Sequence, residues 1–507
     1  MLAAKRFMKE GWPWAFLVFL GTILRLRQYF FNRALWADEA ALALNIVHRS
    51  LGDLIQPLDY GQASPLGFLF GVKIFASLFG NYDYVLRLFP LFMGLLALFL
   101  MGVLAKKYTG WAGLFALAVF AINTPLVYYS SELKQYGTDV LVALLMLILA
   151  SRCLSETSRP RDFAFLGAAG MLAVWFSHPA AFVVAAVGLT LLIEKLTGRL
   201  KIPFTWLILL GLAWTLSFGL DYVVSLQHIA ASDYLQGYWK KAFMPIPPWD
   251  DKRWYLETYF YLVSVTLTTT DWTLGMLTAL LAVVGGISLF FRQRSSALLI
   301  GLTFFLTGLA CALQKYPLKD RFMLFMAPMV LILLSEALGL LYRAARKLGP
   351  WLALVAPVLL ALYLLSFPQS GLDILSQPRT QAEIKPVMAA LAQNRAPGDF
   401  VYVYHTAVKS YLYYAPFYGV DPENTIYGYD TNLKKPALQH FQDDVKNLHD
   451  SGGRVWFVFS DVVDCGGCRG DMQAYYRAYL SGYGKRLQSI PSVNAGAYLY
   501  QMGNQPK

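Results

Sequence analysis

The stretch VLRLFPLFMGLLALFLMGVLA at residues 85–105 decides the fold class of this chain. Its length is close to the roughly 20 apolar residues that a helix needs to cross a bilayer. Arg87 is its one charged residue, and Lys106 and Lys107 follow it directly. A long apolar run that ends in a basic pair is typical of a transmembrane helix.

Similar apolar runs recur along the first three-quarters of the chain. Of the 507 residues, 57% are hydrophobic and only 15% are charged, against about 25% charged in soluble proteins. The sequence therefore predicts an integral membrane protein, an all-α bundle with about eleven transmembrane helices. We place them at residues 12–31, 85–105, 111–128, 138–154, 163–177, 180–194, 203–226, 272–291, 297–313, 321–341 and 350–367.

Positive charge lies in short clusters between these runs. The formal net charge is +12, but no nucleic-acid-binding motif accompanies it, so we exclude a nucleic acid partner. Lys and Arg gather in every second loop, and such loops face the cytoplasm. This pattern predicts a cytoplasmic N-terminus, a first external loop at residues 32–84 and an external C-terminal tail. The apolar run at 64–80 is then an interfacial or re-entrant helix within that loop.

The tail has the pattern of a small α/β domain. We expect strands at 399–404, 454–460 and 495–501 and helices at 381–394 and 435–450. The chain would thus divide into a transmembrane domain at 1–367 and an extracytoplasmic α/β domain at 368–507. Cys465 and Cys468 form Cys-Gly-Gly-Cys in the tail. An oxidising compartment favours a local disulfide between them, ahead of a redox pair or a zinc site.

Two adjacent carboxylates, Asp38 and Glu39, directly follow the first span. Carboxylates beside hydrocarbon are costly and are often retained for function. The pair fits two interpretations about equally well. One is a solvated helix start, where acidic side chains favour the helix dipole. The other is a general base or a metal ligand at the membrane face.

A second polar cluster, YYSSELKQYGTD at residues 128–139, lies at the external ends of the third and fourth spans. Glu132 and Tyr136 are four residues apart and would share one helix face. Lys134 is suited to bind a phosphate as a flexible point charge. The alternative is an interfacial belt of tyrosines with one solvated ion pair. His178, in the next external turn, fits a turn residue better than a ligand.

Lys315, Lys319 and Arg321 precede the tenth span, again on the external side. Three cations there run against the positive-inside pattern, which favours an anionic head group as their partner. Arg25 and Arg27, near the external end of the first span, either join that site or extend toward the interface. Carboxylates and cations thus gather on one membrane face, as expected of an enzyme that uses a lipid phosphate.

The order of these features resembles the polytopic GT-C glycosyltransferases, and within them the family of protein O-mannosyltransferases and lipid A aminoarabinose transferases. The resemblance covers roughly residues 12–345. It rests on LWADEA at 35–40, ASPLG at 63–67, LRLFP at 86–90, YSSELKQY at 129–136 and DRF at 320–322. Family members often carry a histidine before the Pro-rich segment, where this chain has Ala63 and Ser64. That departure argues against a metal site.

The resemblance implies transfer of a sugar from a polyprenyl-phosphate donor to a hydroxyl of a glycan, lipid or protein acceptor. Transfer would occur outside a bacterial inner (plasma) membrane, with inversion at the anomeric carbon. Asp38 would be the base, and Glu39 would orient it or the acceptor. The donor phosphate would be held by Lys134, Arg321 and, as a weaker candidate, Arg87. The substrate would also contact Glu132, Tyr136 and Lys319. No cofactor is assigned, and a divalent cation stays open.

Two other classes of protein remain as alternatives. A transporter or flippase for a lipid-linked substrate would carry paired broken helices and ionisable residues near the bilayer midplane. In this chain the ionisable residues lie at the external edge of the spans instead. The second alternative is a noncatalytic membrane assembly protein with a degenerate core. The presence of Asp38 argues only mildly against it.

Overall fold

The computed structural model describes residues 11–269, 271–366, 368–420, 423–428, 437–462 and 472–503. These residues form two compact units. The helical unit contains the described residues up to Phe31, with Leu51–Pro57 and Ala63–Pro378. The sheet unit contains Asn32–Ser50, Leu58–Gln62 and the described residues from Arg379 onward. The first loop after the N-terminal helix is therefore divided, and its acidic beginning belongs with the C-terminal part of the chain.

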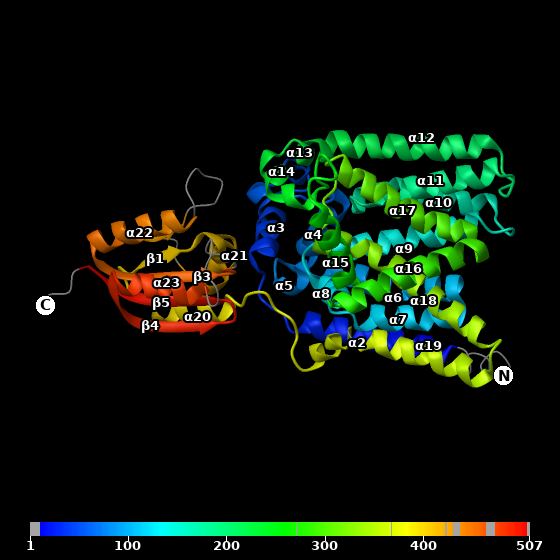
Figure 1. Cartoon of the computed structure of the whole chain (residues 1–507). Helices are drawn as coiled ribbons and strands as arrows, with labels where there is room; N and C mark the ends of the chain where they lie inside the picture. Colours follow the sequence, from blue (N-terminus) through cyan, green and yellow to red (C-terminus); the bar gives the residue numbers. More distant parts are fainter. Residues whose placement is uncertain are drawn as a thin grey trace. The chain divides into compact units, whose positions relative to one another are not determined.

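The helical unit consists mainly of long apolar helices that lie side by side (Figure 1). Its helices are α2 (Trp12–Phe30), α4 (Leu66–Phe79), α5 (Asp83–Leu86), α6 (Leu88–Thr109), α7 (Gly113–Ile122), α8 (Thr124–Tyr128), α9 (Tyr136–Cys153), α10 (Pro160–Phe176), α11 (Ala180–Leu196), α12 (Phe204–Asp221), α13 (Gln227–Ala230), α14 (Asp233–Trp239), α15 (Lys252–Leu267), α16 (Trp272–Arg292), α17 (Arg294–Ala312), α18 (Ala327–Ala345) and α19 (Pro350–Leu365). Short 3-10 segments between them include η4 (Tyr129–Ser131), η6 (Lys240–Ala242) and η7 (Asp320–Met326).

Six helical stretches in the described part of the chain are long and apolar enough to cross a membrane. They are Leu88–Ile122, Tyr136–Cys153, Phe204–Ala230, Trp272–Arg292, Arg294–Ala312 and Asp320–Ala345. The prediction of an integral membrane protein is confirmed at this level. Some expected spans form shorter helices, such as α10 and α11, each of 17 residues. The total of about eleven spans therefore stays a prediction.

Helices α6 and α9 pack along each other near the centre of the helical unit. Leu98, Met101 and Leu147 are fully buried in this core. Between membrane helices, close packing rather than exclusion of water supplies most of the attraction. Helix α6 ends at Thr109, and Gly110 follows it with a φ of +59°, which only glycine adopts readily. The apolar stretch that predicted a membrane helix therefore also supplies buried side chains to the core of the helical unit.

Arg25 is buried inside the helical unit, with 1% of its surface exposed. Its guanidinium donates hydrogen bonds to the backbone oxygens of Gly21 at 3.0 Å, Phe120 at 3.2 Å and Ala121 at 3.3 Å. The last two lie in the final turn of α7, where carbonyl groups lack helical partners. Arg25 thus joins α2 to the end of α7. The expectation that it joins a binding site or extends to the interface is wrong.

The sheet unit contains a five-stranded mixed sheet in the order β2-β1-β3-β5-β4. The strands are β1 (Phe400–Val403), β2 (Thr425–Tyr427), β3 (Gly453–Ser460), β4 (Gly484–Ser492) and β5 (Ala495–Met502). Strand β1 runs parallel to β2 and β3, whereas β5 runs antiparallel to β3 and β4. Strand β3 is central and buried along most of its length. Pro491 lies in β4, at the edge, where a missing backbone donor is tolerated.

Helices pack on this sheet (Figure 1), and one of them contacts the acidic segment. Phe441 and Tyr476 pack with aromatic residues of β1, β3 and β5 on one face. The helices of the unit are α3 (Ala37–His48), α20 (Lys385–Asn394), α21 (Val408–Tyr418), α22 (Ala437–Ser451) and α23 (Met472–Ser481). Helix α20 packs against β4 and β5, and α3 packs against α21. The sequence therefore contributes to this unit from both ends of the chain.

The predicted α/β layer in the tail is confirmed. The three expected strands correspond to β1, β3 and β5, and the two expected helices correspond to α20 and α22. Strands β2 and β4 and helices α21 and α23 were not expected. The predicted disulfide between Cys465 and Cys468 lies outside the described residues. The two remaining cysteines, Cys153 and Cys311, are buried free thiols.

Candidate functional site

The YSSELKQY segment lies between α8 and α9 and is held from two directions. The Asn123 side chain accepts a hydrogen bond from Leu126 N at 2.9 Å and caps α8. Its amide donates to Thr266 O in α15 at 2.9 Å. A Cβ atom on Gly94 of α6 would lie 2.4 Å from the Ser130 Cβ. Only glycine therefore allows η4 to approach α6 this closely, and the contact sets the position of the residues that follow.

Glu132, Lys134 and Tyr136 are all buried, with exposed fractions of 0%, 4% and 4%. Glu132 has extended backbone angles and α9 begins only at Tyr136. The expectation that Glu132 and Tyr136 share a helix face is therefore wrong, because the 3-10 turn η4 interrupts the helical path. A solvated ion pair is also excluded here, since both charged side chains are removed from solvent.

A cavity of about 470 Å³ opens beside this segment. It is lined by Pro125, Tyr129, Tyr238, Trp239, Lys241, Ala242, Ser264, Val265, Lys319, Asp320, Arg321 and Phe322. Three of these are cations, namely Lys241, Lys319 and Arg321. Asp320 lies between two of them. The lining combines positive charge with tyrosine and tryptophan side chains, which suits a ligand that carries both an anionic group and a ring.

The backbone around Asp320 turns sharply between the two cations. Lys319 is extended, whereas Asp320 has a φ of +43°, a left-handed conformation that is uncommon outside glycine. Strained residues of this kind cluster at functional sites. The turn directs Lys319 and Arg321, although they are only two residues apart, to the same cavity.

Lys241 was missed in the sequence interpretation. It reaches the cavity because the segment around it is tied to the segment that carries Lys319. Leu318 N donates to Ala242 O at 2.9 Å, and the Gln314 side chain donates to Met244 O at 2.7 Å. The signal available in the sequence was the basic pair Lys240–Lys241 after Trp239, on the same predicted side as Lys319.

Aromatic rings surround Arg321 and fix the wall of the cavity. The guanidinium lies 5.3 Å from the centre of the Tyr136 ring, within the range of a cation–π interaction. The Phe322 ring meets Trp239 at 4.8 Å and Tyr136 at 5.9 Å between ring centres. Tyr316 donates to Phe322 O at 3.0 Å. Burial raises the pKa of Tyr316 well above its usual range, so this phenol stays protonated and remains a donor.

His178 lies in the turn before α11. Burial lowers its pKa to about 4, so the imidazole is neutral at neutral pH. Its Nε2 atom is buried without a hydrogen-bond partner. It does not line the cavity. These features agree with a turn residue, as expected from the sequence, and give no sign of an anion-binding role.

Asp38 and Glu39 lie in the first turn of α3, in the sheet unit. Glu39 is fully buried and its Oε1 lies 3.8 Å from Nη2 of Arg33, which is also buried. Asp38 is partly exposed. A solvated helix start therefore does not describe Glu39, whose charge is neutralised internally. Asp38 is the carboxylate of the pair that is more accessible to a ligand.

The segment before α3 is held by a set of side chains that we call the loop clamp: Glu383, Lys385, Ser410 and Tyr414. Ala34 N donates to Glu383 at 3.1 Å, and Lys385 Nζ donates to Asn32 O at 2.5 Å. Leu35 N donates to Tyr414 Oη at 2.7 Å, and Ser410 Oγ donates to Leu35 O at 3.0 Å. Backbone polar groups of Asn32, Ala34 and Leu35 are thus bonded by residues from the C-terminal part of the chain.

The structure brings some of the predicted site residues together and not others. Lys319 and Arg321 line the cavity, and Tyr136 lies behind it with its ring against Arg321. Glu132 and Lys134 are buried in the adjoining turn but do not line it, and Arg87 is buried at the start of α6. Asp38 and Glu39 belong to the other unit. The predicted site residues are therefore divided between the two units.

Residues 63–218 match the family model described as dolichyl-phosphate-mannose-protein mannosyltransferase. The matched region includes the YSSELKQY segment and ends before the segment with Lys319 and Arg321. No curated protein sequence matches the chain.

Solved structures extend the comparison over nearly the whole chain. The oligosaccharyltransferase of Archaeoglobus fulgidus, in a complex with zinc and sulfate, matches with a TM-score of 0.55 and 12% sequence identity. That match covers 96% of this chain and 73% of the other. The chain has the GT-C fold. The predicted resemblance to GT-C glycosyltransferases is thus confirmed.

Two further GT-C structures are similar. The oligosaccharyltransferase AglB of Archaeoglobus fulgidus, in complex with an inhibitory peptide and a dolichol-phosphate, has a TM-score of 0.52 and 12% identity, with coverage of 97% and 74%. ArnT of Cupriavidus metallidurans in the apo state has a TM-score of 0.48 and 14% identity, with coverage of 95% and 97%.

The zinc in one of these GT-C structures raises the question of a metal here. Among the described residues of this chain, no three or more His, Cys, Asp or Glu side chains are grouped so that they could hold a metal ion. The donor set around the cavity is cationic, which does not fit a divalent cation. We therefore derive no chemical step through a metal.

Proposed function

We propose that this GT-C protein transfers a sugar from a polyprenyl-phosphate donor to an acceptor hydroxyl at the external face of the membrane. The single observation that carries the proposal is the cavity that contains Lys241, Lys319 and Arg321. Cations placed near membrane level are retained for binding anionic groups. A phosphate attached to a lipid is the anion that such a membrane protein meets most readily.

In the proposed reaction, the acceptor oxygen attacks the anomeric carbon while the bond between that carbon and the phosphate oxygen breaks. The leaving phosphate gains negative charge, which Lys241, Lys319 and Arg321 stabilise. Fixed cations in a site that excludes water are worth more than the same cations in solution. The Tyr238 and Trp239 rings line the cavity and offer flat surfaces for the sugar. Tyr136 supports Arg321 from behind, and Lys134 and Glu132 support the adjoining turn.

The acceptor hydroxyl must lose its proton as it attacks. We assign this proton to the Asp38 carboxylate, because Asp38 is the partly exposed member of the acidic pair and Glu39 is buried beside Arg33. Attack from the face opposite the departing phosphate inverts the anomeric carbon. Arg87 is a secondary candidate for the donor phosphate.

Two solved structures of this fold support the choice of ligands. The archaeal AglB structure contains a dolichol-phosphate, and a further structure of the same oligosaccharyltransferase is tethered to an acceptor peptide. A polyprenyl-phosphate sugar is therefore our proposed donor, and a glycan, lipid or protein hydroxyl our proposed acceptor.

The test is a donor panel. Purified protein in lipid nanodiscs is incubated with a series of polyprenyl-phosphate sugars, and the release of free polyprenyl phosphate is measured. We expect Lys319→Gln to weaken donor binding and to lower the rate, because it removes a charge from the cavity. The loss of one stabilising group of this kind typically costs about 10²–10³ in rate.

Lys315→Gln is the matched control, since Lys315 is an exposed lysine of the same segment that does not line the cavity. We expect it to behave as wild type. Equal losses in both variants would mean that only general surface charge matters. Movement of the intact donor across the membrane without release of polyprenyl phosphate would identify a flippase instead.

A further inference from the structure

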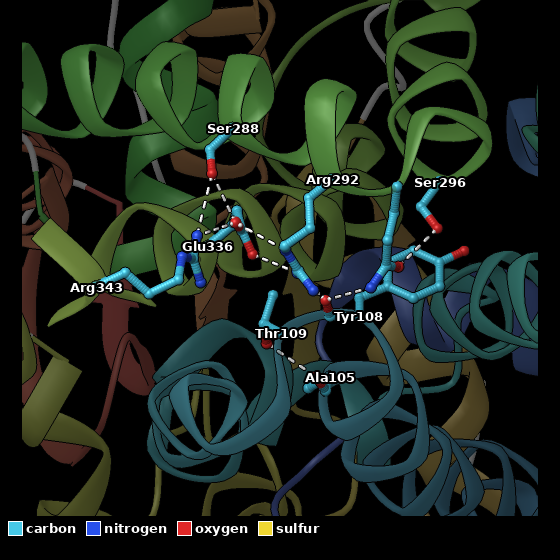
Figure 2. A network of polar contacts seen from close by, with 9 residues as sticks. Ala105, Tyr108, Thr109, Ser288, Arg292, Ser296, Glu336 and Arg343 are labelled. Atoms are coloured by element: carbon cyan, nitrogen blue, oxygen red, sulfur yellow. Dashed lines mark hydrogen bonds and ion pairs between the residues drawn. The ribbon is translucent and has the colours of Figure 1, made fainter. Parts of the chain in front are cut away.

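An ion cluster around the buried Glu336 joins the C-terminal parts of α16 and α18 (Figure 2). Glu336 is 1% exposed and accepts hydrogen bonds from Ser288 Oγ at 2.7 Å and Arg343 Nη2 at 2.7 Å. Arg292 Nε also donates to it, at 3.2 Å. Arg292 further donates to the backbone oxygen of Tyr108 in α6. Two guanidinium groups thus share one carboxylate.

The cluster keeps one positive charge in excess, and part of it is accessible. The side chains of Arg292 and Arg343 are 35% and 44% exposed, although Glu336 is fully enclosed. Each guanidinium carries five N–H donors in a planar fork. The hydrogen bonds to Glu336, Ser288 and Tyr108 use only some of them. An anion can therefore approach from outside without breaking the internal pairs.

A hollow of about 490 Å³ begins at these arginines. Its other walls are the apolar side chains of Val284, Ile287, Phe291 and Leu340. Ile287 is 55% exposed and Phe291 is 84% exposed. Because α16 is long and apolar enough to cross a membrane, we expect this apolar surface to face lipid tails rather than water. The hollow thus joins a cationic head to an apolar wall.

We propose that this hollow binds a bilayer phospholipid with a monoanionic phosphodiester head group, with the phosphate at Arg292 and Arg343 and an acyl chain along Ile287 and Phe291. Basic pockets between transmembrane helices are known to hold anionic lipid head groups. The single excess charge matches a phosphodiester. A polyprenyl monophosphate would bring up to two negative charges to a cluster that balances one.

Free inorganic phosphate would use the arginines but not the apolar wall. The bound lipid would stabilise the contact between α16 and α18, because its phosphate joins a side chain from each helix. This site is independent of the proposed glycosyl transfer. Residues 320–322, which line the donor cavity, precede α18, whereas Leu340 and Arg343 lie near its end. At 1.5 Å per residue the two sites are about 30 Å apart along that helix.

The experiment measures lipid retention by the purified full-length protein. Delipidated protein in detergent is titrated with phosphatidylglycerol or phosphatidylcholine, and bound lipid is counted by native mass spectrometry. We expect phosphatidylglycerol to bind selectively and to raise the unfolding temperature. Arg343→Gln should lower its affinity about fivefold, since one basic group near the membrane surface contributes that much. Arg346→Gln is the control, because Arg346 is exposed on the next turn but does not line the hollow.

A second variant leaves the ion cluster intact. Ile287→Trp should fill the apolar part of the hollow and reduce retention of phosphatidylglycerol, even though both arginines remain. Equal retention of phosphatidylcholine would overturn the proposal. So would equal losses in Arg343→Gln and Arg346→Gln, which would indicate diffuse surface charge. Displacement of phosphatidylglycerol by undecaprenyl phosphate at a lower concentration than phosphatidylglycerol itself would reassign the hollow to the polyprenyl lipid and overturn our choice of occupant.

Discussion

The two carboxylates of α3 are neighbours in sequence but differ in environment. Asp38 is partly exposed, whereas Glu39 is buried beside Arg33. We expect Asp38→Asn to lower turnover by about 10²–10⁴, because asparagine keeps the shape but cannot accept the acceptor proton. Donor binding should persist, and single-turnover kinetics with a separate donor-binding assay would measure both.

Glu39→Gln provides the contrast at the same scale. It removes the negative charge that faces the buried Arg33, and breaking a buried pair costs about 3–5 kcal/mol. We therefore expect this variant to lose thermal stability, whereas Asp38→Asn keeps it. Wild-type turnover in Asp38→Asn would remove Asp38 from the mechanism and leave Glu39 or Glu132 as the base to test.

The residue types in the sequence predicted the positive charge of the cavity. They did not predict how the chain is arranged around it. Lys319 and Arg321 were chosen because cations on the predicted external side need an anionic partner, and both line the cavity. The helix-face argument for Glu132 failed because η4 interrupts the helix, and no helix breaker such as proline marks that break. Lys241 was overlooked because its approach to the cavity depends on hydrogen bonds with residues some seventy positions away.

The loop clamp is an element-scale feature, since α21 supplies two of its hydrogen bonds. We expect the double variant Ser410→Ala with Tyr414→Phe to release the segment before Asp38. Each lost hydrogen bond is worth about 0.5–1.5 kcal/mol. Hydrogen exchange at residues 34–40 should accelerate, and turnover should fall while donor binding is retained. Tyr475→Phe, an exposed tyrosine of α23, is the control.

Unchanged exchange at these amides in the double variant would show that the clamp does not hold the segment, whatever the activity. Faster exchange with normal turnover would separate the clamp from catalysis. Helix α21 itself could not be predicted from its sequence, VKSYLYYAPFY. Its tyrosines favour strands and Pro416 disfavours a helix interior. Packing against α3 and α20 overrides both preferences.

For the whole molecule, the basic loops predict that the sheet unit is outside the cell and the α18–α19 connection is inside. A tag at the C-terminus should be reached by antibody in spheroplasts. A tag inserted after Lys347, between α18 and α19, should be reached only after the membrane is permeabilised. A C-terminal tag accessible only after permeabilisation would invert this topology and the location of every proposed site residue.

The sequence predicted two kinds of architecture in the chain, but it placed a single boundary between them, at residues 367 and 368. Apolar runs marked the helical unit, and alternating strands and helices marked the tail. No local sequence pattern indicates that residues 32–50 belong to the sheet unit, because the contacts of this segment join positions hundreds of residues apart. Hydrophobic periodicity predicts local secondary structure and carries no information about contacts between distant positions.

The separation between Ala34 and its clamp partner Glu383 is 349 residues. During synthesis at about 5–20 residues per second, the acidic segment waits roughly 20–70 s before that partner is made. A growing chain therefore carries its membrane helices for tens of seconds before the acidic segment acquires its final support. Loss of the last quarter of the chain would remove the loop clamp. A truncated product would therefore insert in the membrane without the hydrogen bonds that hold the segment before Asp38.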